Sequence, residues 1–374
     1  MCEEADQGRS GVGRRVGERV SLPVMQETGS RIGQGKVACF FAKVDDPAIL
    51  ERVEFYAQDI RILRDLGFEV RIATKLTDLA PADLYFVWWW TWAFFPVTYA
   101  RSRGKPVVIS GTMNWHVHGE RNRLHRWMIE RSLRRADANI FVSQLELARV
   151  TADVEVSGAS YSPHTYEEGD YYPADVPEEK ICLSVAWTGK HNAVRKCVPE
   201  IIDAAVALHA DFPDLRFLIA GLRGDGYADL QARIDAHGAG DYVEFLGVVS
   251  KEEKIRLMRA CSVYLSPSRF EGFGLAILEA MACGACVVTS PVGAVPEVVG
   301  AAGVLVDGTD VDAIRLAVTD LLRDPERRAS VGQRAAARAK ELFKYERRLT
   351  DLGAVIAKVL HARNAETASR TAAQ

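Results

Sequence analysis

The stretch SPSRFEGFGLAILEAMACGACVVTS, residues 266–290, combines the end of a strand, a glycine-containing loop, a helix and a second strand. In the loop, Gly272 and Gly274 allow the backbone to approach a ligand closely, because neither residue carries a Cβ. The following segment 275–283 predicts a helix, whose free N–H groups and positive dipole end suit a diphosphate. A plain tight turn is an equally good interpretation of this pattern taken alone, since such units are common in α/β proteins.

The alternation of strand and helix continues on both sides of this stretch. Short apolar runs lie at residues 37–41, 69–73, 84–87, 107–109, 139–142, 181–185, 216–220, 243–247, 262–266 and 286–290. Such runs are typical of strands buried on both faces of a parallel sheet. Amphipathic segments between them, such as 50–66 and 252–259, predict helices. We therefore expect an α/β fold with two doubly wound, Rossmann-like parallel sheets of about five strands each.

Composition along the chain predicts four segments. Residues 1–35 are rich in Gly, lack the apolar core of a signal peptide and predict a flexible N-terminal tail. The first sheet then falls in 36–173 and the second in 174–345, separated near 162–180 by a Pro-rich, acidic stretch that is typical of a linker. Residues 346–374 predict a C-terminal helix that crosses back to the first domain and ends in a mobile tail.

Length, charge and cysteine usage restrict the class of protein. A chain of 374 residues is long enough for two domains, and its formal net charge of -3 gives no electrostatic footprint for nucleic-acid binding. The seven cysteines are irregularly spaced, which suits a reducing cytoplasm. The most apolar run, Leu84–Ala100, is shorter than the ~20 residues of a membrane-spanning helix and contains Pro96. We expect a cytoplasmic protein, with peripheral contact at the inner membrane face as an alternative.

Two short motifs suggest redox or metal chemistry but have simpler explanations. Cys283 and Cys286 form a CxxC without a second Cys pair, so core packing is favoured. Asp310 and Asp312 form a DxD at the predicted start of a helix, where Asp is a capping residue. We therefore expect neither a metal nor a cofactor.

Two glutamates follow the strand that ends at Ser266. Glu271 lies in the loop before the helix, and Glu279 lies inside the helix. In a helix their spacing would correspond to ~12 Å in rise and ~80° in rotation. The two carboxylates therefore cannot form the close pair, ~5–5.5 Å apart, of a retaining glycosidase. Apolar neighbours on both sides of Glu279 predict that its side chain is partly buried.

The segment EGFG…EAMACG resembles the signature of retaining GT-B-fold glycosyltransferases of family 4, also described as glycosyltransferase group 1 with a glycogen synthase-like signature. The resemblance extends over residues 37–345 and is strongest over 215–310. It implies a hexosyltransferase-type enzyme that moves a sugar from a nucleotide-diphosphate sugar to a hydroxyl acceptor, with retention of configuration. It places the enzyme in bacterial polysaccharide, glycolipid or glycoside biosynthesis, with the nucleotide sugar as a substrate rather than a cofactor.

The resemblance also implies which residues hold the donor. Glu271 would bind the donor sugar at the catalytic centre, and Glu279 would bind the ribose, since a carboxylate accepts hydrogen bonds from two vicinal hydroxyls well. Backbone contacts to the sugar, the diphosphate and the base would come from Gly272, Phe273, Gly274, Leu275 and either Val248 or Val249.

A leaving diphosphate needs cations when no metal is present. The family supplies them after the first strand of its C-terminal domain, where this chain reads ICLSVAWTGKHNAVRKCVPE, residues 181–200. Lys196 matches the family's Lys, but Trp187 and Cys197 stand where the family has Arg and Gly. We expect Arg195 to replace the missing charge, with solvated loop cations as the alternative.

The N-terminal half resembles the family less closely. The segment GKPVVISGTMNWHVHG, residues 104–119, resembles the strand whose end carries an active-site histidine. His116 and His118 are both candidates, with His118 preferred and a structural histidine as the alternative. Six of the seven Trp lie between positions 88 and 127, and Trp rings stack on sugars, fill cores and sit at membrane interfaces. We expect a carbohydrate, lipid-linked or small-molecule acceptor beside Trp90, Trp92, Trp115 and Asp45.

Two other functions are compatible with the same sequence. A nucleotide-sugar epimerase or hydrolase on this fold would use the same donor residues. A degenerate nucleotide-sugar-binding protein would agree with the departures at Trp187 and Cys197. Measuring diphosphate release with and without an acceptor distinguishes a transferase from an epimerase or hydrolase. Nucleotide binding without turnover would identify a degenerate binding protein.

Overall fold

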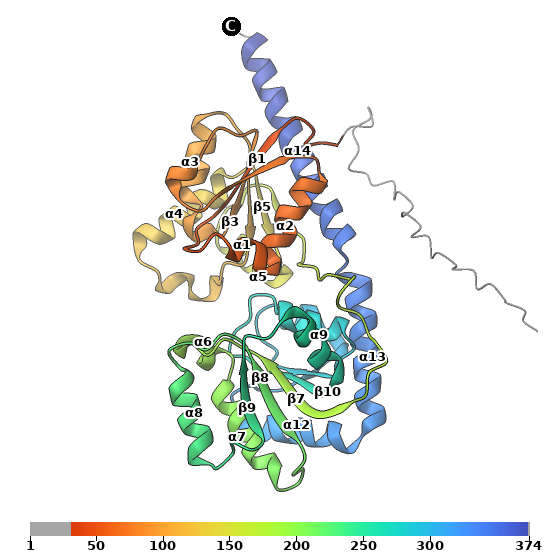
Figure 1. Cartoon of the computed structure of the whole chain (residues 1–374). Helices are drawn as coiled ribbons and strands as arrows, with labels where there is room; N and C mark the ends of the chain where they lie inside the picture. Colours follow the sequence, from red (N-terminus) through yellow and green to blue (C-terminus); the bar gives the residue numbers. More distant parts are fainter. Residues whose placement is uncertain (1–30, 373–374) are drawn as a thin grey trace, which may run out of the picture.

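The computed structural model describes residues 31–372, which form two parallel six-stranded sheets with helices packed around each (Figure 1). The first sheet, in the order β2-β1-β3-β4-β5-β6, consists of Val37–Ala42 (β1), Glu69–Ala73 (β2), Leu84–Trp88 (β3), Val107–Gly111 (β4), Ala138–Phe141 (β5) and Ala159–Tyr161 (β6). The second, in the order β12-β11-β10-β7-β8-β9, consists of Glu179–Val185 (β7), Arg216–Ala220 (β8), Val243–Gly247 (β9), Cys261–Ser266 (β10), Val287–Thr289 (β11) and Val304–Leu305 (β12). The predicted α/β fold with two doubly wound sheets is confirmed, with six strands in each sheet rather than about five.

Helices connect the strands of each sheet. The helices of the N-terminal half are Ile49–Arg52 (α1), Glu54–Asp65 (α2), Phe94–Ser102 (α3), Arg123–Arg135 (α4) and Gln144–Asp153 (α5), with short 3₁₀ helices at Leu76–Asp78 (η1), Trp90–Trp92 (η2) and Trp115–Glu120 (η3). Those of the C-terminal half are Lys190–Arg195 (α6), Val198–His209 (α7), Tyr227–Ala236 (α8), Lys251–Ala260 (α9), Leu275–Ala282 (α10), Val295–Val299 (α11), Gly300–Ala302 (η4), Val311–Arg323 (α12), Pro325–Leu342 (α13) and Tyr345–Ala372 (α14).

The strand order reverses beside the first strand of each sheet, between β1 and β3 in one and between β7 and β10 in the other. In open α/β sheets, ligands bind beyond the carboxyl ends of the strands at such a reversal. Both reversals face the same space between the sheets. Trp88, at the end of β3, and Glu271, in the loop after β10, line one cavity. The topology alone therefore predicts a ligand site in this interdomain cleft.

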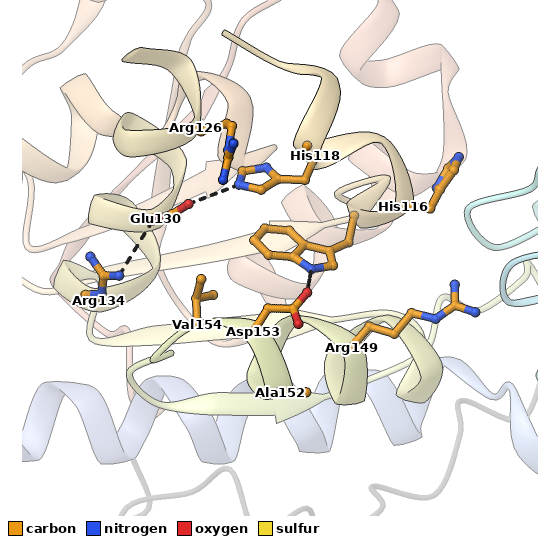
Figure 2. Close-up of a pocket in the computed structure, with 11 residues that line it drawn as sticks. His116, His118, Arg126, Glu130, Arg134, Arg149, Ala152, Asp153 and Val154 are labelled. Carbon is orange, nitrogen blue, oxygen red and sulfur yellow. Dashed lines mark hydrogen bonds and ion pairs between the residues drawn. The ribbon is translucent and has the colours of Figure 1, made fainter. Parts of the chain in front are cut away.

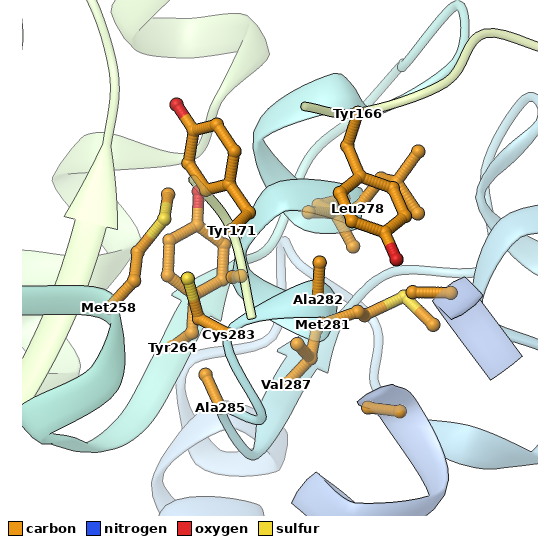
Figure 3. Packing of buried hydrophobic residues seen from close by; sticks show 14 of the residues in the cluster. Tyr166, Tyr171, Met258, Tyr264, Leu278, Met281, Ala282, Cys283, Ala285 and Val287 are labelled. Atoms are coloured by element: carbon orange, nitrogen blue, oxygen red, sulfur yellow. The ribbon is translucent and has the colours of Figure 1, made fainter. Parts of the chain in front are cut away.

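Helix α10 is the most completely buried helix beside the cleft, because nearly every residue along it is apolar. Tyr166 and Tyr171, from the segment that joins the two sheets, lie in the same buried cluster as Leu278 and Met281 of this helix (Figure 3). The joining segment, predicted as a linker, is therefore held against the C-terminal half by two buried tyrosines.

Helix α14 returns from the C-terminal half and packs along the N-terminal one (Figure 1), with Leu352 and Ile356 in the core of the first sheet. Arg348 in this helix is fully buried and forms an ion pair with Asp59 of α2. The helix continues to Ala372, although the sequence predicts a mobile tail there. Its last turns are rich in good helix formers, and elongating an existing helix is much easier than starting one.

A second contact between the halves involves Glu297 of α11. Its carboxylate accepts hydrogen bonds from the Ser143 hydroxyl at 2.7 Å and from the backbone N–H groups of Gln144 and Leu145 at 2.7 and 2.8 Å. These are the first N–H groups of α5, which otherwise lack partners within their own helix. A carboxylate of one half thus caps a helix of the other.

Three other sequence predictions differ in detail from the structure. The helix expected over 50–66 is divided into α1 and α2 at Val53, which has an extended ψ of 114°. The tail expected over 1–35 lies outside the described residues up to position 30, but Ile32 is buried in the core of the first sheet. Within residues 31–372, none of the helices combines the length and the apolar character that crossing a membrane requires.

Candidate functional site

The loop after β10 leads into α10 through two glycines. Gly274 caps α10 with a φ of 92°, a left-handed conformation that Gly adopts without strain. A Cβ on Gly272 would lie 3.0 Å from the Thr112 side chain in the N-terminal half. The sequence predicted that a ligand approaches the backbone here. In this structure the Thr112 side chain, on the opposite wall of the cleft, lies close to Gly272.

Glu271 lies between the two predicted cations. Lys196 Nζ donates a hydrogen bond to its carboxylate, and Arg195 Nη1 lies 3.3 Å from the same oxygen. Burial raises the pKa of Glu271, but Lys196 and then Arg195 outweigh it, so the net pKa is below the usual value. The carboxylate is therefore ionised at neutral pH, and the structure brings together three residues that the sequence analysis assigned to the donor.

Arg195 is held in place by further contacts. Its guanidinium donates to the Phe270 carbonyl at 2.9 Å and to Asn192 Oδ1 at 2.7 Å. The carbonyl of Trp187, which occupies the position of the family's Arg, accepts a hydrogen bond from the Asn192 side chain, and the Trp187 ring is 53% exposed. Arg195 therefore supplies a fixed cation at the cleft, while Trp187 faces outward.

Glu279 lies on the first turns of α10 but is only 5% exposed. Lys254 of α9 donates a hydrogen bond to its carboxylate at 2.9 Å. Tyr171 lies beside Glu279. Burial, and then the charge of this carboxylate, raise the pKa of the tyrosine. The buried position predicted for Glu279 is observed, and the carboxylate already has a cationic partner.

The loop after β9 carries the residues predicted to contact the base. Val248 is 73% exposed and Val249 is half-buried. Leu222 follows the end of β8 and is 51% exposed, and Gly221 N donates to the Gly247 carbonyl across the two strands. Val248, Leu222 and the exposed Trp187 thus form an apolar row across the carboxyl ends of three adjacent strands.

A cavity of about 270 Å³ lies between the two halves at this point. Its C-terminal wall is made of Arg195 and residues 270–275, and its N-terminal wall consists of Phe55, Trp88, Trp89, Thr112, Asn114 and His164. Of these N-terminal wall residues, Trp88 and Trp89 belong to the tryptophan cluster that the sequence analysis placed on the acceptor side, and the other four were not predicted. Two of the wall residues, Trp89 and Asn114, have positive φ angles of 72° and 54°. Non-glycine residues in this conformation store strain and cluster at functional sites.

His164 is the most unusual residue of that wall. It is 3% exposed, its ring stacks on Trp88 at 5.6 Å, and its edge faces Phe273 at 5.0 Å. Its Nδ1 atom is buried without a hydrogen-bond partner among the described residues. Burial, and then the nearby Arg348, lower the pKa of His164 well below the usual range, so the imidazole is neutral. A single His in a Pro-rich joining segment gives no sequence signal for this position.

The two candidate histidines occupy different environments. His118 is buried, stacks on Trp115 at 3.9 Å and lies 3.4 Å from Glu130 and 3.0 Å from Arg121. The His116 ring instead lies 4.1 Å from the ring of Phe270, directly before Glu271. The structure therefore brings His116, rather than the preferred His118, to the donor loop.

The predicted acceptor-side residues do not gather in one place. Trp90 is 1% exposed, stacks on Phe141 and donates to Asn139 at 2.8 Å, because the chain turns back into the core after Trp89. Trp92 is 45% exposed on the outer surface, and Asp45 is exposed with Lys43 as its ion-pair partner. Trp115 alone of the four lies beside Glu271, in a narrow cavity of about 20 Å³.

The CxxC motif is part of the core, as predicted. Cys283 and Cys286 are 4% and 3% exposed, and burial raises the pKa of each thiol to about 12. Asp310 caps α12 by accepting a hydrogen bond from Ala313 N at 3.0 Å. Neither motif has the geometry of a reactive site.

Comparison with protein families identifies the C-terminal half. Residues 178–338, a little under half of the chain, match the family described as "Glycosyl transferases group 1". A curated relative, the O-antigen chain mannosyltransferase B of Escherichia coli, is 39% identical over 129 residues, which are 34% of either chain. The phosphatidyl-myo-inositol mannosyltransferase of Mycolicibacterium smegmatis is 35% identical over 158 residues, which are 41% of this chain and 40% of the relative. The chain thus spans between a third and a half of the length of these relatives.

Solved structures resemble nearly the whole chain. The sucrose-phosphate synthase of Thermosynechococcus elongatus superimposes with a TM-score of 0.73 at 19% identity, over 87% of this chain and all of the other. Anabaena Alr3699/HepE, solved in complex with UDP and glucose, gives a TM-score of 0.67 at 18% identity over 90% of this chain and all of the other. The fold is therefore GT-B, as predicted, and the resemblance to glycosyltransferase group 1 is confirmed for residues 178–338.

Proposed function

We propose that the protein is a retaining glycosyltransferase that moves a hexose from a nucleotide-diphosphate sugar to a hydroxyl acceptor in the interdomain cleft. The observation that carries the proposal is the group formed by Glu271, Lys196 and Arg195 at the start of α10. It lies where the strand order of the second sheet reverses, the place where α/β proteins bind ligands. The match of residues 178–338 to glycosyltransferase group 1 supports the same reaction class.

The donor diphosphate takes the place of Glu271 as the partner of the two cations. Without a donor, Lys196 and Arg195 neutralise the Glu271 carboxylate. A diphosphate carries more charge than a carboxylate and also receives the N–H groups at the start of α10, so it competes for both cations. Glu271 is then free to accept hydrogen bonds from the hydroxyls of the donor sugar. In this proposal, donor binding therefore also releases the Glu271 carboxylate from the two cations.

The transfer itself proceeds on one face of the sugar. The bond from the anomeric carbon to the diphosphate oxygen breaks, the acceptor oxygen bonds to that carbon from the same side, and the acceptor proton passes to the leaving diphosphate. The cations stabilise the charge that develops on the leaving group. In this proposal Glu279 takes no part in bond breaking. Its carboxylate accepts a hydrogen bond from Lys254 of α9 and binds the hydroxyls of the ribose. The proposal includes neither a metal nor a cofactor.

The acceptor side is the N-terminal half. Anabaena Alr3699/HepE is described in complex with UDP-glucose, and the Mycolicibacterium relative is named for a phosphatidyl-myo-inositol acceptor. We infer that a nucleotide-linked hexose, such as a UDP-hexose, and a carbohydrate, lipid-linked or small-molecule acceptor are the substrates. Trp92, Phe95 and Trp127 are exposed on η2, α3 and α4, and such aromatics favour the membrane interface. Peripheral contact at the cytoplasmic membrane face is therefore part of the proposal.

The test is diphosphate release from a panel of nucleotide sugars, with and without acceptor extracts. Wild type should release diphosphate rapidly only when an acceptor is present, and chelation of metals should not change the rate. Glu271→Gln should reduce the rate by roughly 100–1,000-fold, the scale of losing one transition-state contact. Glu252→Gln, at an exposed position on α9, is the matched control and should be unaffected.

Three outcomes would contradict the proposal. Near-normal turnover by Glu271→Gln would remove the residue from the reaction. Rapid release without an acceptor would indicate a hydrolase, and an isomerised nucleotide sugar would indicate an epimerase.

A further inference from the structure

The cavity that contains Glu271 has an aromatic N-terminal side. It is lined there by Phe55 of α2, by Trp88 and Trp89 at the end of β3, and by His164 of the joining segment, and we call these four residues the aromatic wall. Between ring centres, Phe55 lies 5.2 Å from Trp88 and 5.8 Å from Trp89, and His164 stacks on Trp88 at 5.6 Å. A continuous group of rings therefore faces residues 270–275, the donor loop, across the cavity.

The aromatic wall offers few hydrogen-bonding groups to a ligand. Trp88 Nε1 donates to Asp59 at 3.1 Å, and Trp89 Nε1 donates to the Tyr56 hydroxyl at 2.6 Å. Both indole N–H groups are thus used inside the protein. A ligand hydroxyl buried against these rings would lose water without gaining a partner, which is unfavourable. An apolar ring has no such loss and gains the offset or edge contacts that aromatic rings prefer.

Another cavity of the N-terminal half has the opposite chemistry. It lies between η3, α4 and α5, has a volume of about 680 Å³, and is bounded by three arginines and two acidic side chains, Arg126, Arg134, Arg149, Glu130 and Asp153 (Figure 2). Of the described residues that line the N-terminal side of the Glu271 cavity, none is an acid, a lysine or an arginine. A charged group of a ligand in the Glu271 cavity therefore belongs on its C-terminal side, where Arg195 lies.

His164 is the polar exception in the aromatic wall, because its imidazole lacks a partner. Its Nδ1 atom is buried and makes no hydrogen bond within residues 31–372. Burial, and then the charge of Arg348, lower the pKa of His164 well below the usual range, so the ring is neutral. In a neutral imidazole one nitrogen donates and the other accepts. A hydroxyl both donates and accepts, so it satisfies Nδ1 in either tautomer, whereas an ionised carboxylate only accepts.

This unpaired imidazole lies beside the donor loop. The rings of His164 and Phe273 meet edge to face at 5.0 Å between ring centres, and Phe273 follows Glu271 by two positions. A hydroxyl bonded to His164 is therefore close to the carboxylate that we assign to the donor sugar. Phe55 and Trp89 are the half-buried members of the aromatic wall, and they offer their rings to the rest of the molecule.

We propose that the acceptor is an aromatic alcohol, whose ring packs on Phe55 and Trp89 and whose hydroxyl is bound by His164 and directed at the donor sugar. That this molecule is the acceptor rests on the proposed function, whereas its binding to the aromatic wall does not. His164 stays neutral and positions the hydroxyl, and the proton still passes to the leaving diphosphate. The proposal narrows the acceptor to small molecules with one hydroxyl on an otherwise apolar ring.

Ligand-observed NMR titration tests the site with benzyl alcohol and toluene, which differ by one hydroxyl, and with methyl α-glucoside, each with and without UDP. Wild type should bind benzyl alcohol more tightly than toluene, and methyl α-glucoside at least about 10-fold more weakly than benzyl alcohol. Trp89→Ala should weaken benzyl alcohol binding roughly 2–12-fold, the equivalent of one aromatic stack. Tyr172→Ala, at a 49% exposed position of the joining segment outside the cavity, is the matched control and should keep the wild-type Kd.

Two variants of His164 separate the hydrogen bond from the packing. His164→Phe keeps a ring against Trp88 but has no nitrogen. It should weaken benzyl alcohol binding roughly 2–12-fold, the range of one hydrogen bond, and leave toluene binding unchanged. His164→Asn returns a hydrogen-bonding group and should again bind benzyl alcohol more tightly than toluene. If His164→Phe folds poorly, His164→Asn and Trp89→Ala still test the aromatic wall.

Three results would overturn the proposal: no binding of benzyl alcohol to wild type with or without UDP, tighter binding of methyl α-glucoside than of benzyl alcohol, or an equal effect of His164→Phe on benzyl alcohol and toluene. Failure of the proposed function looks different. Diphosphate release would then be absent with every nucleotide sugar, while benzyl alcohol still binds and Trp89→Ala still weakens its binding. When both proposals hold, benzyl alcohol accelerates diphosphate release and toluene does not.

Discussion

Replacing Arg348 by Met should destabilise the N-terminal half more than any other single change at a charged residue of α14. The guanidinium is fully buried and donates five hydrogen bonds: to Asp59 Oδ1 at 2.7 Å, Asp59 Oδ2 at 2.9 Å, Ser162 O at 2.6 Å, Pro163 O at 3.1 Å and Ser110 Oγ at 3.3 Å. Without it, the one donor to the Asp59 carboxylate that remains among residues 31–372 is Trp88 Nε1 at 3.1 Å. The variant therefore leaves a buried charge without its counter-ion.

The expected size follows from that uncompensated charge. Removing one partner of a buried ion pair costs ~3–5 kcal/mol. For a unit of 150–250 residues, each kcal/mol lowers Tm by ~2–4 °C. The unfolding transition of the N-terminal half should therefore fall by roughly 6–20 °C in differential scanning calorimetry. Arg347→Met, one position earlier on α14 and exposed, should change Tm by less than about 2 °C.

A double variant isolates the charge from the lost packing. Asp59→Asn/Arg348→Met has no buried charge left, and the amide oxygen at position 59 can still accept from Trp88. It should therefore recover part of the stability lost in Arg348→Met. A Tm for Arg348→Met within about 2 °C of wild type would refute this reasoning. So would a double variant that is less stable than Arg348→Met.

Three further predictions concern titration, packing and reactivity. Burial and then Glu167 raise the pKa of Glu54 to about 7. Because the unfolded chain ionises this carboxyl at a lower pH than the folded protein does, stability should fall as pH rises from about 4.5 to 7. Glu54→Gln should therefore raise Tm more at pH 8 than at pH 5, and equal gains at the two pH values would contradict this. Trp90→Ala should lower the free energy of unfolding, measured in urea, by ~3–5 kcal/mol. Trp89→Ala should instead raise the acceptor KM roughly 2–12-fold, the equivalent of an aromatic stack of ~0.5–1.5 kcal/mol. The reverse pattern would contradict both assignments. The Cys283 thiol should resist alkylation in the native protein, and labelling as fast as in urea would show that it is accessible.

The fold was predictable because its determinants are local. Alternating apolar runs and amphipathic segments specify strands and helices within windows of about ten residues, and such alternation has few topological solutions. The pairing of Glu271 with Arg195 and Lys196 also agrees with the sequence analysis, since the carboxyl ends of adjacent parallel strands meet at one edge. The assignment of Arg195 and Lys196 rested on the family resemblance rather than on position along a strand, because both residues follow the end of β7 by ten residues or more.

The N-terminal wall of the cleft was not predictable for a physical reason. Thr112 and His164 reach the donor loop only through the packing of one half on the other, between segments far apart in the chain. The sequence analysis expected the acceptor beside Trp90, Trp92 and Trp115, whereas Trp88 and Trp89 line the cavity. The positive φ of Trp89 turns the chain so that Trp90 enters the core and Trp89 faces the cavity. A single backbone angle of this kind leaves no periodic pattern in a sequence.

The cap that Glu297 places on α5 makes the motion of the two halves observable at single amides. The N–H groups of Gln144 and Leu145 are covered only while the two halves are in contact, because their acceptor belongs to the opposite half. Their hydrogen–deuterium exchange therefore counts separations of the halves, independently of any substrate. The exchange rate of these two amides therefore reports how often the two halves separate.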